Sequence, residues 1–372
     1  MNLDHIPIID HHAHAVFHEP LWRSEPLEPM FTEAYDADIW RHHVRNNLYF
    51  QRSIADLAGF YGCEEDVEAV LAARQRCDYL ELGRRFFRAA NISDWLIDDG
   101  IWTDRLMSVE QCAALGPRTA RVLRLEAEIA PFIQDHDSAR SLFQAFNQHL
   151  EKVAPSLIGF KSIIAYRTGL DVVPHDWPAV EAAYTEFKRE LRPGQIPRLN
   201  TKPLNDTLLW WALEVAAASG KPIQFHTGYG DPDLDMRLAN PLHLRGLLEA
   251  PQLAGLKVVT LHCYPYVREA GYLASVYGGA YLDLGLTVPY LSVQGMRGAV
   301  QEALHLSPVS KVLFSSDAQR TPEMFWLAAK WGRKVLGQSL QGAIDDGDLR
   351  PAQAERAAEM ILRGNAQQVY GL

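Results

Sequence analysis

The stretch Ile8-Ile9-Asp10-His11-His12-Ala13-His14 combines a short apolar run with two histidines spaced two residues apart. An apolar run that begins just after Pro7 predicts a β-strand, in which alternate side chains point to the same face. His12 and His14 would then present two imidazoles side by side, an arrangement that suits zinc or another first-row divalent metal. His11 alternates with them and is expected to be structural. An incidental cluster or the remnant of a tag is less favoured, because strand residues precede the histidines.

The composition limits the class of protein. The chain has 372 residues, 48% of them hydrophobic, so one large barrel domain spanning residues 1–372 fits as well as two smaller domains. A formal net charge of −10 argues against a nucleic-acid partner, since such proteins carry a basic stripe. The four cysteines are scattered and predict neither disulfides nor a cysteine zinc site. Without a visible signal peptide or membrane-length apolar run, a cytoplasmic protein with no membrane partner is expected.

Residues 19–91 differ in character from the rest of the chain. Apolar residues recur there at helical spacing, as in Val67, Val70 and Leu71, with charged residues between them. This pattern predicts a helical insertion after the first strand. The insertion could act as a lid over a ligand pocket or simply stabilise the fold, and the sequence leaves both open.

After the insertion, short apolar runs alternate with longer amphipathic stretches. Predicted helices include residues 109–115, 139–153 and 208–218. The strand that begins at Ile8 is followed by seven further candidates, at residues 95–97, 121–125, 157–166, 221–226, 256–261, 280–284 and 312–314. Eight strands separated by helices are typical of a (β/α)8 TIM barrel.

Metal-binding residue types end several of these predicted strands. The five residues at or just past a strand's carboxyl end are His12, His14, His226, His262 and Asp317. In a TIM barrel, the carboxyl ends of the strands form the active face. Singly, such a histidine is more often a hydrogen-bonded structural residue, and an aspartate after two serines is commonly a helix N-cap. Together they favour a metal site, because barrel stability does not require imidazole repeatedly at that face.

These residues resemble the amidohydrolase superfamily. His12-Ala13-His14 is similar to the family's opening signature, and His226, His262 and Asp317 match its ligand positions on strands five, six and eight. Lys161 is similar to the strand-four lysine that reacts with carbon dioxide in members with two metal ions. More narrowly, residues 160–170 and 226–231 resemble the nodulin and fluffy-G-like branch of the superfamily.

The resemblance implies a centre with two divalent ions, zinc first and manganese, iron or nickel as alternatives. The implied ligands are His12, His14 and Asp317 for one ion, His226 and His262 for the other, and a carbamate on Lys161 for both. A lysine buried in a strand loses its charge easily, so its neutral amine can add carbon dioxide. The alternative is an ordinary lysine that reaches solvent or a carboxylate. The ions would share a hydroxide, with Asp317 as general base and acid.

Substrate contacts are less clearly marked. Arg167 is the best candidate for a carboxylate clamp, because a guanidinium group can bind both oxygens at once. Arg320 and Arg268 are alternatives, and any of the three could instead be a surface or helix-capping arginine. Three further residues follow the strand-end histidines closely enough to line the same pocket: Tyr229, Asp231 and Tyr264. Trp95 and Trp102 are more typical of a core.

The predicted function is hydrolysis of a C–N bond, in an amide of a small carboxylate-containing substrate. The branch resemblance implies a γ-glutamyl amide as one hypothesis. A first alternative is a decarboxylase with one metal ion, in which Lys161 needs no carbamate. A second is a barrel that binds a metabolite or partner without catalysis. The expected partner is a small molecule. The sequence leaves the oligomeric state open, with a homodimer as the usual prior.

Overall fold

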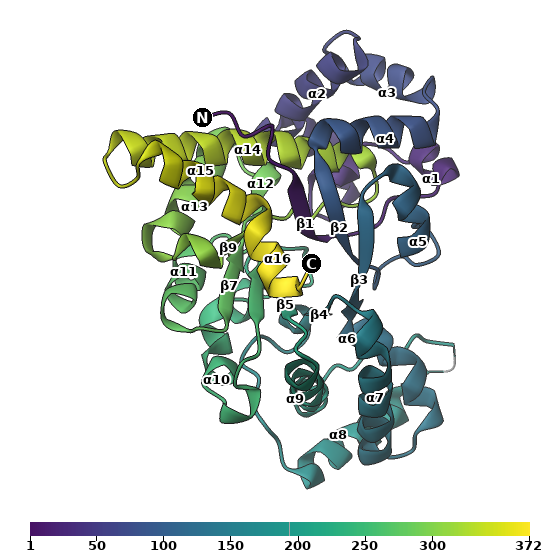
Figure 1. The fold of residues 1–372 in the computed structure, drawn as a ribbon. Coiled ribbons are helices and arrows are strands. Elements are labelled where there is room, and N and C mark those ends of the chain that lie inside the picture. Colours follow the sequence, from purple (N-terminus) through teal and green to yellow (C-terminus); the bar gives the residue numbers. More distant parts are fainter. Residues whose placement is uncertain (193) are drawn as a thin grey trace.

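The computed structural model describes residues 1–192 and 194–372, and its centre is an eight-stranded sheet (Figure 1). The strands follow one another in chain order: β1 (Ile8–Ala13), β2 (Ile92–Asp98), β3 (Arg118–Arg124), β4 (Gly159–Ser162), β5 (Ile223–His226), β6 (Val258–Leu261), β7 (Ala280–Asp283) and β9 (Val312–Leu313). Each neighbouring pair is parallel. The (β/α)8 barrel predicted from the alternation of strands and helices is confirmed.

Backbone hydrogen bonds bring the end of the sheet back to its first strand. The Asp317 N–H donates to the His12 carbonyl at 3.1 Å, and the His14 N–H donates to the Ala318 carbonyl at 2.8 Å. Both bonds lie just past β9. They complete the ring and fix Asp317 beside the strand that carries the two histidines.

Helices alternate with the strands and surround them (Figure 1). Between β1 and β2 lie α1 (Glu19–Ser24), α2 (Leu48–Tyr61), α3 (Val67–Gln75) and α4 (Tyr79–Ala90), with short 3-10 or π turns at Glu28–Phe31, Ile39–His43 and Val44–Asn46. The later helices are α5 (Val109–Cys112), α6 (Leu125–Glu128), α7 (Ala139–Val153), α8 (Trp177–Glu190), α9 (Lys202–Ser219), α10 (Arg245–Leu248), α11 (Val267–Val276), α12 (Thr287–Tyr290), α13 (Val293–Leu306), α14 (Pro322–Asp345), α15 (Pro351–Glu359) and α16 (Asn365–Tyr370). A short strand β8 (Gly285–Leu286) precedes α12. Within the described residues, no helix has the length and apolarity needed to cross a membrane.

Helix α4 attaches the segment between β1 and β2 to the outer layer of the barrel. Asp78 caps its start by accepting a hydrogen bond from the Glu81 N–H, and Asn91 ends it in a left-handed conformation. Phe87 is buried on its inner face, with its ring centroid 4.9 Å from that of Phe325 in α14. Full burial of such a side chain stabilises the fold by about 1.5–3 kcal/mol.

The fourth strand is shorter than the predicted span of residues 157–166. β4 ends at Ser162, and Ile163 leaves the extended conformation with φ −112° and ψ 29°. The Glu126 carboxylate accepts hydrogen bonds from the Ser162 hydroxyl at 2.6 Å and the Ile163 N–H at 3.0 Å. Because a side chain satisfies these groups, the chain leaves the sheet and forms a 3-10 turn over Ile164–Tyr166.

Candidate functional site

Polar side chains at the strand ends converge in the mouth of the barrel. Asp317 Oδ1 lies 3.1 Å from His12 Nε2 and 3.6 Å from His14 Nε2, and Asp317 Oδ2 lies 3.6 Å from His262 Nδ1. Donor atoms of His12, His262 and Asp317 all lie within 4.8 Å of one another. The barrel thus brings together residues from β1, from the end of β6 and from the segment after β9.

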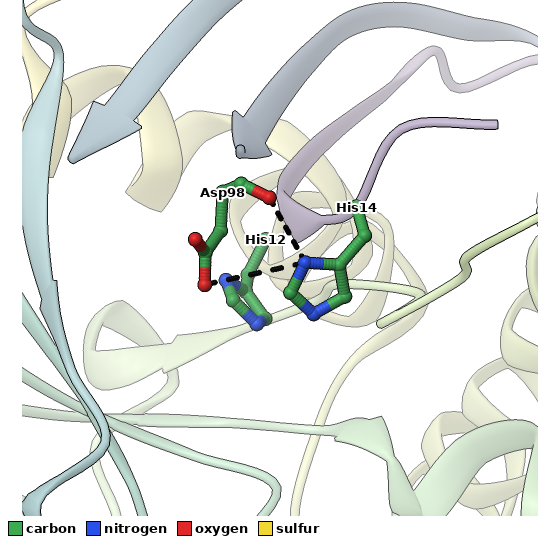
Figure 2. Close-up of side chains that lie close together, drawn as sticks. All are labelled: His12, His14 and Asp98. Atoms are coloured by element: carbon green, nitrogen blue, oxygen red, sulfur yellow. Dashed lines mark hydrogen bonds and ion pairs between the residues drawn. The ribbon is translucent and has the colours of Figure 1, made fainter. Parts of the chain in front are cut away.

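Hydrogen bonds orient His12 in β1 and His14 just past its end. His12 Nδ1 lies 2.8 Å from Gln224 Oε1, and His14 Nδ1 lies 2.9 Å from the Asp98 carbonyl oxygen. Figure 2 shows the latter contact, with Asp98 beside both rings. An oxygen acceptor at Nδ1 requires the proton there, so each Nε2 keeps a free lone pair. Both rings therefore offer Nε2 toward Asp317.

Lys161 lies next to this cluster. Its side chain is 1% exposed, and its Nζ lies 3.4 Å from His12 Nε2. Burial lowers the pKa of the amine to about 8, while the nearby Asp98 and Asp317 carboxylates oppose that shift. More of the amine is therefore neutral than in water, which is the form that adds carbon dioxide.

His226 has a different set of contacts. Its ring centroid lies 4.5 Å from that of His262, so it borders the cluster. Its Nε2, however, lies 3.0 Å from the Tyr166 hydroxyl and 3.1 Å from the Tyr229 carbonyl oxygen. The carbonyl acceptor requires the proton on Nε2, so Nδ1 of His226 keeps the free lone pair.

Burial controls the protonation of the cluster. Removal from water lowers the pKa of three histidines well below the ordinary value: His12, His226 and His262. The pKa of His14 falls to about 4 for the same reason. Burial raises the pKa of Asp317 to about 6, although His14 and Lys161 oppose this shift. Neutral imidazoles are the form that binds a metal ion.

Two buried polar atoms of the cluster have no hydrogen-bond partner in the described part of the chain. They are Nδ1 of His262 and Oδ1 of Asp317. Leaving a buried polar atom unpaired costs about 1–3 kcal/mol. Imidazole nitrogen and carboxylate oxygen are ligands that zinc and other first-row ions accept. The donor set therefore fits a divalent metal ion, which would supply the missing partner.

Backbone strain is concentrated around a cavity at the mouth of the barrel, beside the cluster. Of the seven non-glycine residues with positive φ in the described chain, five line this cavity: Trp102 (44°), His262 (69°), Leu286 (57°), Asp317 (51°) and Arg320 (69°). Each such conformation costs on the order of 1–3 kcal/mol and persists only where the surrounding structure holds it. Strained residues of this kind cluster at active and ligand-binding sites.

A cavity of about 570 Å³ adjoins the cluster, a volume suited to a small molecule. It is lined by all six predicted metal ligands and by three of the predicted substrate residues, Arg167, Asp231 and Arg320. Among the described residues, the lining does not include Tyr229 or Tyr264. The Tyr229 N–H donates to the Tyr264 carbonyl at 2.6 Å, so these residues meet through their backbones, and the Tyr264 side chain is exposed.

Arg268, His11 and Trp95 each make contacts that stabilise the fold. Arg268 is exposed on α11 and pairs with Glu302, with 2.9 Å between Nη2 and Oε1. His11 is buried, with its ring nitrogens 3.1 Å from the Tyr370 hydroxyl and 3.0 Å from an Asp283 carboxylate oxygen. Trp95 is a core residue, packed between Phe87 and Phe325.

Several lining residues were not predicted. Trp102 was expected in the core, yet it lines the cavity, with the Arg320 guanidinium 4.5 Å from its ring centroid. Three more come from the segment between α1 and α2: Glu33, Tyr35 and Trp40. The Tyr35 hydroxyl donates to Asp231 at 2.5 Å, which connects this segment to the loop after β5. None of these residues ends a strand, so no sequence signal marked them.

Arg124 is a missed residue that a strand-end search could have found. It lies at the end of β3, within the predicted strand, and lines the cavity. Its guanidinium donates to both carboxylate oxygens of Asp98: Nε lies 3.1 Å from Oδ1, and Nη2 lies 2.6 Å from Oδ2. This charge holds the pKa of Asp98 below its usual range despite burial. The pair keeps Asp98 ionised beside His14.

Comparisons with known proteins show what this chain is similar to. A family model described as Amidohydrolase matches residues 166–372. Protein fluG of Emericella nidulans is 32% identical over 407 aligned residues, which cover 98% of this chain and 46% of fluG, so the chain spans about half of that protein. A crystal structure from Lactobacillus casei ATCC 334, assigned as a metal-dependent hydrolase, is 34% identical with a TM-score of 0.87, covering 99% of this chain and 96% of that one. Uronate isomerase of Thermotoga maritima shares the fold at 12% identity, with a TM-score of 0.65 and coverage of 99% and 95%.

Proposed function

Because this chain belongs to the amidohydrolase superfamily, we propose that it is a metal-dependent hydrolase that cleaves a C–N bond, the amide of a small carboxylate-containing substrate. One observation carries the proposal. His12, His262 and Asp317 converge beside a cavity of small-molecule size, and two of their buried atoms lack a partner in the described chain. A γ-glutamyl amide is the first substrate to test.

The residues that would hold the metal are those at the strand ends: His12, His14, His226, His262, Asp317 and Lys161 as its carbamate. Zinc suits these ligands, as do manganese, iron and nickel. A divalent ion held there would polarise the amide carbonyl and lower the pKa of a water molecule. The buried amine of Lys161 supports carbamate formation, since it is the neutral amine that reacts with carbon dioxide.

Asp317 is placed to move the proton. Its carboxylate would accept a proton from the attacking water as the water oxygen bonds to the amide carbon. It would then deliver that proton to the nitrogen as the C–N bond breaks, which leaves a carboxylic acid and an amine. Its backbone bond to the His12 carbonyl of β1 supports this role, because the bond fixes the carboxylate in the mouth of the barrel.

A decarboxylase with one metal ion is the second candidate. One observation favours it: His12, His262 and Asp317 form a compact three-donor group, and His226 is not among its members. A single ion would need only such a group. In that case Lys161 would remain an amine without a carbamate. The reaction would release carbon dioxide from a carboxylic acid substrate.

Metal content and product identity separate the two candidates. The purified protein would be analysed for metal ions per chain and then incubated with γ-glutamyl amides and other amides of small acids, and separately with aromatic and aliphatic carboxylic acids. We expect the wild type to release an amine from the amides. Asp317→Asn should lose nearly all turnover but keep much of its metal. Carbon dioxide release with one ion per chain would favour the decarboxylase. Metal-replete protein with neither activity would contradict both.

A further inference from the structure

Arg167 and Arg198 are two of the five arginines that line the cavity in the described chain. Arg167 directly follows the 3-10 turn Ile164–Tyr166 after β4, and Arg198 lies in the segment between α8 and α9. Arg198 carries no sequence signal, since it ends no strand and belongs to no helix. The fold nevertheless brings its charge close to Arg167, and burial together with this like charge lowers the pKa of Arg167.

Arg167 lacks the partners that the other cavity arginines have. Arg124 pairs with Asp98, and Arg105 pairs with Glu25. Arg320 donates to the Pro29 carbonyl at 2.8 Å and lies over the ring of Trp102. Within the described residues, Arg167 forms no ion pair within 4.0 Å, and its one side-chain hydrogen bond is a long 3.4 Å contact to the adjacent Tyr166 carbonyl. Its guanidinium fork is therefore free to bind a ligand.

The local charges favour a ligand with a single negative charge. Arg198 Nη2 lies 3.6 Å from Asp233 Oδ2, so this carboxylate offsets one of the two positive charges. One positive charge then remains on Arg167. Asp231 also lines the cavity and would repel a doubly charged phosphate more strongly than a carboxylate. A planar carboxylate matches both the charge and the forked geometry of arginine.

The position of this pair sets it apart from Asp317. β4 and β9 are the fourth and last strands in the eight-strand order, so they face each other across the barrel. Arg167 follows β4, whereas Asp317 follows β9. The charged groups that act on Arg167 most strongly are Arg198, Glu126, Arg124 and Asp233, and none of them is a predicted metal ligand.

We propose that Arg167 and Arg198 form a carboxylate-binding subsite, which holds the far end of the substrate while its amide lies at the Asp317 cluster. This inference rests on the proposed function and narrows its substrate class. The substrate would be a half-amide of a short dicarboxylic acid, in which a few bonds separate the free carboxylate from the amide. An amide without that carboxylate would bind weakly.

Binding of glutarate to the metal-replete protein tests the subsite by isothermal titration calorimetry. Glutaramide, which lacks both charges, and inorganic phosphate serve as comparison probes. The variants are Arg167→Met, Arg198→Met and the control Arg189→Met, an exposed arginine of α8. We expect glutarate affinity to fall at least tenfold in Arg167→Met and severalfold in Arg198→Met, with no change in Arg189→Met. Arg167→Lys should fall in between, because it keeps the charge but loses the fork.

Three results would overturn the subsite. They are no binding of glutarate to the wild type, equal binding by wild type and Arg167→Met, or tighter arginine-dependent binding of phosphate than of glutarate. The two proposals can also fail separately. Arginine-dependent glutarate binding without amine release from half-amides would keep the subsite and reject the hydrolase. Amine release with an unchanged KM in Arg167→Met would keep the hydrolase and reject the subsite.

Discussion

His12 Nδ1 lies 2.8 Å from Gln224 Oε1, and the Gln224 amide nitrogen lies 2.8 Å from the Tyr370 hydroxyl and 2.8 Å from the His11 carbonyl. The two nitrogen contacts fix which end of the amide faces His12. Gln224 therefore holds His12 with its Nε2 directed at Asp317. Through Tyr370, the last helix of the chain supports the candidate metal centre from beneath.

Replacing Gln224 with leucine should weaken metal binding. The variant keeps the side-chain volume roughly constant but removes the acceptor that fixes the His12 tautomer, and loss of such an orienting partner typically costs 10–100-fold in metal affinity. Competition with a chromogenic chelator would measure the change. The control is Gln338→Leu at an exposed position of α14. Equal affinity in folded Gln224→Leu and wild type would contradict this role for Gln224.

A carbamate on Lys161 can be detected without a substrate. Protein loaded with metal in ¹³C-bicarbonate should show a carbamate carbon signal by NMR, because the buried amine has a lowered pKa and so a reactive neutral form. The signal should be absent in Lys161→Met. Metal-replete wild type that shows no such signal would favour the centre with one ion.

The barrel and its strand-end residues were predictable because both depend on periodic sequence. Short apolar runs mark the strands, and the carboxyl end of each strand faces the mouth, so His12, His262 and Asp317 could be placed together in advance. Glu33 and Arg198 could not, because they reach the cavity through irregular segments whose course depends on tertiary packing. The shortened β4 was missed for a similar reason, since Glu126 is what ends it.

Gly230 is packed too tightly for any side chain. A Cβ there would lie 2.1 Å from the Tyr166 hydroxyl and 2.8 Å from His226 Nε2. Gly230→Ala should therefore displace one or both rings and lower kcat/KM by at least about tenfold, the equivalent of about 1.4 kcal/mol in the transition state. Gly246→Ala is the matched control, because a Cβ at that position meets nothing within 4 Å. Turnover of Gly230→Ala equal to that of the control would show that His226 and Tyr166 can shift without consequence.

Glu33 should make the stability of the protein depend on pH. Burial raises the pKa of this cavity-lining carboxyl from 4.5 to about 7; Asp317 and Asp231 act in the same direction, while Arg320 and Tyr290 oppose it. The folded state therefore holds the proton more tightly than the unfolded state. Stability from this group is fully present below about pH 4.5 and is lost as the pH rises to about 7.

Glu33→Gln should remove this dependence. Between pH 5 and pH 8, the wild type should lose about 1–3 kcal/mol more of its free energy of unfolding than the variant does. Urea denaturation at both pH values would measure this difference. Glu186→Gln, at an exposed position of α8, is the control and should follow the wild type. If Glu33→Gln also follows the wild type, the carboxyl is ionised at neutral pH in the folded protein, and the cavity wall beside Arg320 carries a negative charge that any anionic substrate must meet.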